Sequence, residues 1–214
     1  MTSMAIPAFL THYYEASEQP FSSLSDLDHA SLEMKFVELA MLPKRFHRFK
    51  SVQAAREYMQ LRRESEAKVR AQFISKGGMP TLQHPRYMVL GTCQWFDDWY
   101  VAKKEIRIPL DAFDARHVSF TYPDALVSMI LAERPQWEPF RKPYLGMTFT
   151  RNEIEEVVTT YGLPNEDDPA ALQIEERMIE AQIWDLAPLQ PYLYPTRSSS
   201  VSARDHLNPN TRSA

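Results

Sequence analysis

Residues 11–15 carry a histidine beside two tyrosines, a combination with several chemical uses. His12 is followed by Tyr13 and Tyr14. At the end of a strand, such a group can hydrogen-bond a sugar or phosphate, or stack on a base or a nicotinamide ring. The same residues are equally typical of a half-buried aromatic patch, so the motif alone leaves both interpretations open.

Glu180 is the second residue with a chemical role to offer. Residues 177–184 read as a strand, and alternation would place Glu180 on one face with Met178, Gln182 and Trp184. Burial among such neighbours raises the pKa of a carboxyl group unless a cation or N–H donors compensate. A glutamate of this kind can act as a general base or orient a ribose hydroxyl. The alternative is a solvent-facing position at a sheet edge.

A third polar group lies in residues 118–124, where a strand is expected to give way to a helix. Asp124 is predicted to cap the helix over residues 125–131. Ser119 and Tyr122 are candidate binding residues, although a tyrosine at the edge of a core is common.

Two further segments complete the set of candidates. Arg86 and Tyr87 follow a connection that begins with a double glycine, which ordinarily ends a helix but also permits close approach of a phosphate. Residues 95–100 hold four large aromatic side chains, for which packing in the core is the first expectation and a platform for a base the alternative.

Composition excludes several other classes of protein. The chain has 214 residues, a net charge of −4 and only 5 glycines, none of which form a phosphate-binding loop motif. Its single cysteine, Cys93, rules out a disulfide framework and is expected to be a buried, inert thiol. The histidines show no ligand spacing, so no metal site is predicted.

The chain is also expected to act away from membranes. No apolar run approaches the ~20 residues that cross a bilayer, and the N-terminus lacks a basic start and an apolar segment. We therefore expect a cytoplasmic protein. Ten methionines and many aromatic residues allow a homodimer face without requiring one.

The elements that must position these residues follow from periodicity, caps and breakers. Expected strands cover residues 8–14, 86–92, 105–110, 117–122 and 177–184, and expected helices cover 28–41, 52–75, 125–131 and 150–161. Thr150 and Glu153 form a predicted capping box. The order favours an α+β fold: N-terminal helices followed by a mixed or mainly antiparallel sheet with inserted helices. We expect one domain over residues 1–195 and a disordered polar tail over 196–214.

The two long helices carry patterns of their own. Leu27, Ala30, Met34, Val37 and Met41 recur at alternating steps of three and four, which is the apolar spacing of a helix and locates the first of them. Arginines 56, 63 and 70 form a stripe along the second helix, among glutamates 57, 64 and 66, which is typical of a solvated face.

Several segments together resemble a family of uncharacterised bacterial proteins. They are HYYEASEQPFSSLSDL at residues 12–27 and, further along, KGGMP, PRYMVLG, IRIPL, VSFTYPDA and IEAQIW. The resemblance covers roughly residues 9–187 and brings no established activity with it.

The order of residue types also resembles ADP-ribosyltransferase-like enzymes. The resemblance implies that His12 contacts the ribose of NAD, that a tyrosine (Tyr87 or Tyr122) stacks on nicotinamide, and that Glu180 orients the attacked ribose. Two features depart from that family: the helical block over residues 28–76 is longer, and Tyr13 stands where a glycine or a threonine-containing step is typical.

Three functions are therefore open. The first is an NAD-using transferase acting on a nucleic acid, protein or small molecule, which requires His12 and Glu180 to meet in one pocket. The second is a non-catalytic binding or immunity-type module, whose aromatic and arginine faces hold a protein or nucleic-acid partner. The third is a small metal-dependent hydrolase or nuclease using Asp124, Glu180 and a histidine.

Overall fold

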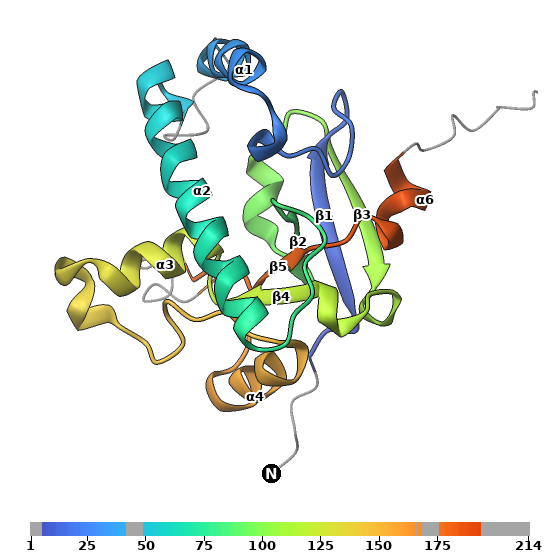
Figure 1. Ribbon diagram of the computed structural model, residues 1–214, viewed down its shortest axis with the longest axis vertical. Helices are drawn as coiled ribbons and strands as arrows, with labels where there is room; N and C mark the ends of the chain where they lie inside the picture. The colour runs from blue at the N-terminus through green and yellow to red at the C-terminus, as the bar shows by residue number, and fades with distance from the viewer. Residues whose placement is uncertain (1–5, 42–48, 166, 168–175, 194–214) are drawn as a thin grey trace, which may run out of the picture.

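A five-stranded antiparallel sheet forms the centre of the computed structural model, which describes residues 6–41, 49–165, 167 and 176–193 (Figure 1). The strand order is β3-β1-β2-β5-β4, and every pairing is antiparallel. The predicted α+β class is thus confirmed. The strands are β1 (Phe9–Glu15), β2 (Arg86–Leu90), β3 (Lys103–Pro109), β4 (Val118–Thr121) and β5 (Glu180–Ile183).

Helices begin where the sequence supplies caps. The side chain of Ser51 accepts a hydrogen bond from the amide of Ala54 at the start of α2, and Thr150 and Glu153 form the predicted capping box of α4. Gly162 ends α4 with a φ of 87°, a conformation that favours glycine. The helices are α1 (His29–Met41), α2 (Val52–Ser75), α3 (Ala125–Glu133), α4 (Arg151–Tyr161) and α6 (Gln190–Leu193).

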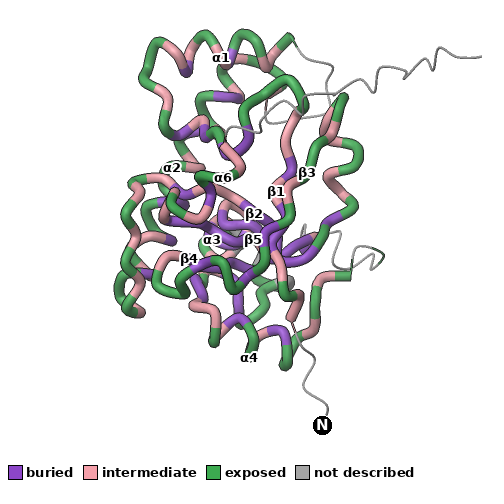
Figure 2. The backbone as a smooth tube through the Cα atoms, turned by 90° about the vertical axis from the view of Figure 1, so that its right-hand side faces the viewer, coloured by how far each residue is buried: buried purple, intermediate pink, exposed green. Residues whose placement is uncertain are grey.

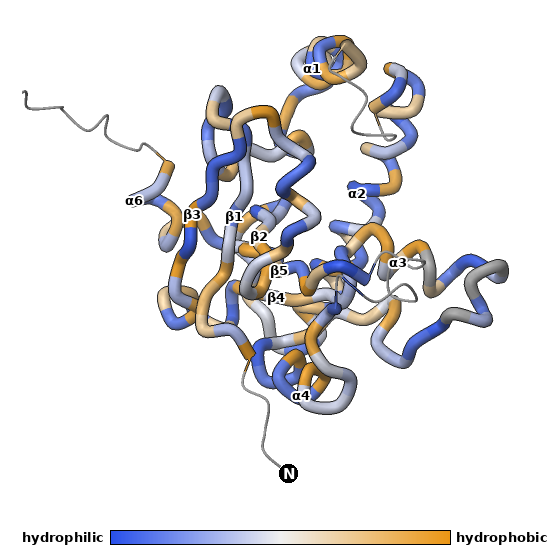
Figure 3. Tube along the Cα trace, turned by 180° about the vertical axis from the view of Figure 1, so that it is seen from behind, coloured by the Kyte–Doolittle hydropathy of each residue, from blue (hydrophilic) through white to orange (hydrophobic). Residues whose placement is uncertain are grey.

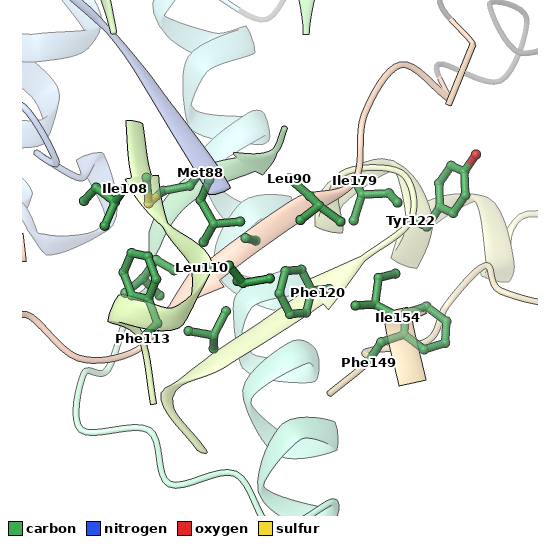
Figure 4. Packing of buried hydrophobic residues seen from close by; sticks show 14 of the residues in the cluster. Met88, Leu90, Ile108, Leu110, Phe113, Phe120, Tyr122, Phe149, Ile154 and Ile179 are labelled. Atoms are coloured by element: carbon green, nitrogen blue, oxygen red, sulfur yellow. The ribbon is translucent and has the colours of Figure 1, made fainter. Parts of the chain in front are cut away.

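The two faces of β5 belong to different layers, as alternation predicts. One face joins the largest apolar cluster, into which α4 inserts Ile154 and Val158 (Figure 4). On the other face, Trp184 packs with residues of α2 and α3, and α3 itself is strongly apolar (Figure 3). The residues on the α4 side are Ala181 and Ile183 of β5, together with Ile179 just before the strand. Helices α2 and α4 therefore cover opposite faces of the sheet.

The helix expected over residues 28–41 is present as α1, but the apolar stripe that located it is not its buried face. Met34 and Met41 are 69% and 80% exposed, whereas Leu32 and Phe36 are buried against α2. Figure 2 shows α1 as mostly exposed or intermediate, with few buried positions. Leu32 and Phe36 are four residues apart and so form an equally good helical stripe. The choice between the two stripes is made by α2, whose Met59 packs in the same cluster.

Two sequence predictions fall on parts of the chain that are not described. The expected tail over residues 196–214 lies outside the described residues, and so does the proposed domain boundary at residue 195. Within the described ranges, no helix is long and apolar enough to cross a membrane.

Candidate functional site

A cavity of about 260 Å³ lies on the α2 side of the sheet and contains the two principal candidates. His12 from β1 and Glu180 from β5 both line it. Tyr13 and Tyr87, also predicted as binding residues, line it as well. Pockets for small ligands usually measure about 300–1,000 Å³, so this one suits a ring with a sugar rather than a whole dinucleotide.

Strand register places Glu180 on the cavity side of the sheet and His12 where the β1–β2 pairing ends. Thr11 pairs with Val89, and Val89 pairs with Glu180, so these three side chains share one face of the sheet. No further β1–β2 pairing follows Thr11 in the described register. His12 comes next and pairs with Ile106 of β3, so alternation places it on the other face of β1 from Thr11. Its ring lies at the strand end and binds across to the Tyr87 carbonyl of β2.

Both ring nitrogens of His12 bind the protein backbone. Nδ1 lies 2.9 Å from the carbonyl oxygen of Tyr87, and Nε2 lies 2.9 Å from the amide nitrogen of Phe21. Because the amide can only donate, Nε2 accepts and Nδ1 carries the proton that is donated to the carbonyl. The Phe21 ring stacks on the imidazole with centroids 4.1 Å apart. The neutral His12 side chain thus links β1 to β2 and to the chain that follows β1.

Burial lowers the pKa of His12 to about 4, against the smaller raising effect of its hydrogen bond to Tyr87. The unfolded chain therefore binds more protons than the folded protein between pH 6.5 and 4, so stability should fall as pH falls through this window. The expected contribution is at most about 3 kcal/mol. Urea unfolding of wild type and His12→Leu across this range would measure it.

The variant should be less stable than wild type at pH 7 and should lack this part of the acid dependence. His29→Leu, at an exposed position on α1, provides the matched control and should keep it. An identical pH dependence in wild type and His12→Leu would contradict the assignment.

Glu180 is held at the start of α3. The amide of Ala125 donates to its Oε2 at 2.9 Å, and Nε2 of Gln182 donates to the same oxygen at 3.1 Å. Burial, and secondly the nearby Asp124 carboxylate, raise the pKa of Glu180 to about 8 despite these donors. A carboxyl group that changes charge near neutral pH in a cavity is suited to acid–base chemistry.

A buried polar network stands behind the cavity and was missed by sequence reasoning. Glu66 of α2 is only 2% exposed, although the glutamates of this helix were predicted to be solvated. Its carboxylate accepts hydrogen bonds from the Tyr87 hydroxyl at 2.8 Å and from Arg62 Nε at 2.9 Å. Ser25 donates to it at 2.8 Å, and His84 Nδ1 lies 2.7 Å away.

This network fixes the position of Tyr87. The guanidinium of Arg62, which lines the cavity, lies over the Tyr87 ring at 4.7 Å from its centroid. Burial alone would raise the pKa of Glu66, but Arg62 and the hydrogen bonds from Tyr87 and Ser25 bring it below its usual value. The i,i+4 spacing of Arg62 and Glu66 was a sequence signal for their ion pair. The burial of Glu66 could not be predicted from that spacing.

Aromatic side chains form one wall of the cavity. This aromatic wall consists of Tyr13, Trp95, Phe96, Trp99 and Tyr100. Tyr13 stacks on Phe96 with centroids 5.0 Å apart, and the Tyr13 hydroxyl accepts the amide of Cys93 at 3.1 Å. Cys93 is buried, as predicted. The four aromatics of residues 95–100 are partly buried and line the cavity; three of them pack against the cluster of Tyr13 and Val89, whereas Trp99 packs on Trp95.

The other three predicted binding residues are not among those lining the cavity. Tyr122 lies in the cluster on the α4 side (Figure 4), where its ring stacks on that of Tyr144. Ser119 is buried, where it donates to Gln182 and accepts from the Trp184 indole. Arg86 forms an ion pair with Asp26. Of the two tyrosines left open by the sequence, only Tyr87 reaches the cavity.

The arginine stripe of α2 is not a continuous free cationic face. Arg56 makes a bidentate ion pair with Glu33 of α1, with its shortest contact at 2.6 Å. Arg70 donates to the carbonyl oxygens of Leu82 and Pro80. Two of the three arginines therefore act within the protein.

Comparison of the chain with family models, with curated proteins and with solved structures finds no match. The protein is thus defined by its own features: an α+β fold with an antiparallel sheet, and an aromatic cavity that contains a glutamate of raised pKa. Among the described residues, no group of three or more His, Cys, Asp or Glu side chains is placed to hold a metal ion.

Proposed function

We propose that the protein is an NAD-using transferase of ADP-ribosyltransferase type, with Glu180 as its central catalytic residue. One observation carries the proposal: Glu180 opens into the same cavity as the aromatic wall and Tyr87. The nicotinamide ring of NAD is flat and positively charged, and aromatic faces and carboxylates both attract such a ring. The ring and its ribose suit a cavity of about 260 Å³, with the rest of the dinucleotide outside it.

The proposed reaction breaks the bond between C1′ of the ribose and the nicotinamide nitrogen. The ring nitrogen keeps the bonding electron pair and leaves as neutral nicotinamide, while C1′ gains oxocarbenium character. Ionised Glu180 stabilises this charge and accepts the proton of an attacking hydroxyl, amine or water, which forms the new bond to C1′. The positive charge of bound NAD favours the ionised form of Glu180.

In this proposal, His12 and Tyr87 have different tasks. Because both nitrogens of His12 bind the backbone, it acts as a positioning residue that holds the gap between β1 and β2. Tyr87, fixed by Glu66 and Arg62, presents its ring to the cavity. Recognition of a ribose hydroxyl is thus left to Glu180.

The aromatic wall gives the proposal a direct binding test. We expect Trp99→Ala to weaken NAD binding about tenfold, since a cation over an indole face is worth about 1–2 kcal/mol when shielded from water. Calorimetric titration with NAD measures this effect. Tyr161→Ala, a change at a half-exposed aromatic residue of α4, should leave the affinity unchanged. Absence of NAD binding by wild type at millimolar concentration would rule the proposal out.

A further inference from the structure

The junction between β4 and α3 places a second carboxyl group beside Glu180. Thr121, the last residue of β4, lies directly opposite Glu180 in the β4–β5 register. The chain then reaches Asp124 in three residues, and α3 begins at Ala125. Asp124 is 8% exposed and lines the same cavity as Glu180.

The N-terminus of α3 holds both carboxyl groups by its first amides. The Ala125 amide donates to Glu180 at 2.9 Å, while the Val127 amide donates to Asp124 Oδ1 at 3.0 Å. Asp124 therefore caps α3, as predicted from the sequence, and it also lines the cavity of the candidate site. The side-chain amide of Gln182 links β4 to Glu180, because it donates to Thr121 and to Glu180.

We propose that Asp124 is a positioning residue for Glu180, acting by its charge from the α3 N-terminus that both side chains share, and that it opposes loss of the Glu180 proton. Two carboxylates that share a partly dry site do not both ionise readily. The inference rests on the proposed function for its catalytic meaning, but the effect of Asp124 on Glu180 does not require NAD.

Other charged groups around Glu180 also affect its ionisation. Arg62 approaches from α2 and favours the ionised form of Glu180, whereas burial disfavours it. The Tyr87 hydroxyl, on β2, stays protonated because burial raises its pKa, and it donates to the Glu66 carboxylate. Asp124 is the negative group that opposes the ionisation of Glu180 most strongly.

The test is the titration of the Glu180 carboxyl carbon by NMR in wild type and Asp124→Asn. Asparagine is as good a helix cap as aspartate but carries no charge, so the fold should persist while the midpoint of Glu180 falls by about one pH unit or more. Asp114→Asn, an equivalent change at the cap of residues 115–117 outside the cavity, should leave the midpoint unchanged. Asp124→Ser, also a neutral cap, replaces the asparagine variant if that variant does not fold.

An unchanged midpoint in the neutral variants would overturn the role of Asp124. Where wild type cleaves NAD, the pH at which cleavage reaches half its maximum should fall by the same amount as the midpoint. A shifted midpoint in a protein that does not cleave NAD would support the paired carboxyl groups and refute the proposed function, so the two failures are distinguishable.

Discussion

Glu180→Gln is expected to lower the rate of NAD cleavage by about 10²–10⁴-fold, the usual contribution of a positioned acid–base group. Glutamine keeps the shape of the side chain and can still accept the amide of Ala125, which donates to Glu180 at 2.9 Å. Binding of NAD should therefore be retained within a few-fold. The measurement is the rate of nicotinamide release at saturating NAD.

The same variant should be more stable than wild type at alkaline pH. The pKa of Glu180 is about 8 in the folded protein, above the ordinary value of 4.5, so the folded state binds more protons than the unfolded state between these values. Its contribution to stability is present below pH 4.5 and is lost as pH rises to 8. Glutamine cannot ionise, so we expect Glu180→Gln to gain about 2–4 kcal/mol over wild type at pH 9 relative to pH 5.

Loss of activity without this pH-dependent gain would mean that Glu180 is already ionised in the folded protein. Asp185→Asn, a change at a partly buried carboxylate outside the cavity, serves as the control and should show neither effect.

Glu66→Gln is expected to have the largest effect on folding, a loss of about 3–5 kcal/mol of unfolding free energy. The carboxylate is 2% exposed and is the partner of Arg62, so its removal leaves a shielded guanidinium without its counter-charge. Chemical denaturation at pH 7 measures the loss. Glu64→Gln, at an exposed position of the same helix, should cost little.

A double variant separates the cost of the unpaired charge from the cost of altered packing. Arg62→Met with Glu66→Gln removes both charges, and it should be more stable than Glu66→Gln alone. If the double variant is the less stable of the two, Arg62 does not depend on Glu66, and the network does not hold Tyr87 as described.

Local signals in the sequence predicted most of the elements but not their contacts. The cap at Ser51, the capping box at Thr150 and the two faces of β5 were all predictable, because each depends on residues a few positions apart. The buried face of α1 was not, since two helical stripes compete and only packing against α2 decides between them. The type of an element depends on residues close in the sequence, whereas the face that it buries depends on tertiary packing.

The candidate site shows the same division. Residue type alone identified His12 and Glu180, but the hydrogen bond between His12 and the carbonyl of Tyr87 joins positions 75 residues apart, and its geometry depends on where β1–β2 pairing ends. Burial of Glu66 likewise requires Tyr87 and Ser25 to meet α2, which no pattern within that helix reveals.

The central claim, that this cavity cleaves NAD at the nicotinamide–ribose bond, is tested most directly by chromatographic measurement of nicotinamide released from NAD by the wild-type protein at pH 8, with Glu180→Gln in parallel. We expect release by wild type that rises with pH through about 8, as Glu180 ionises, and that is about 10²-fold or more lower in the variant. Equal release by both proteins, or release by neither in the presence of water and added amine or hydroxyl acceptors, would contradict it.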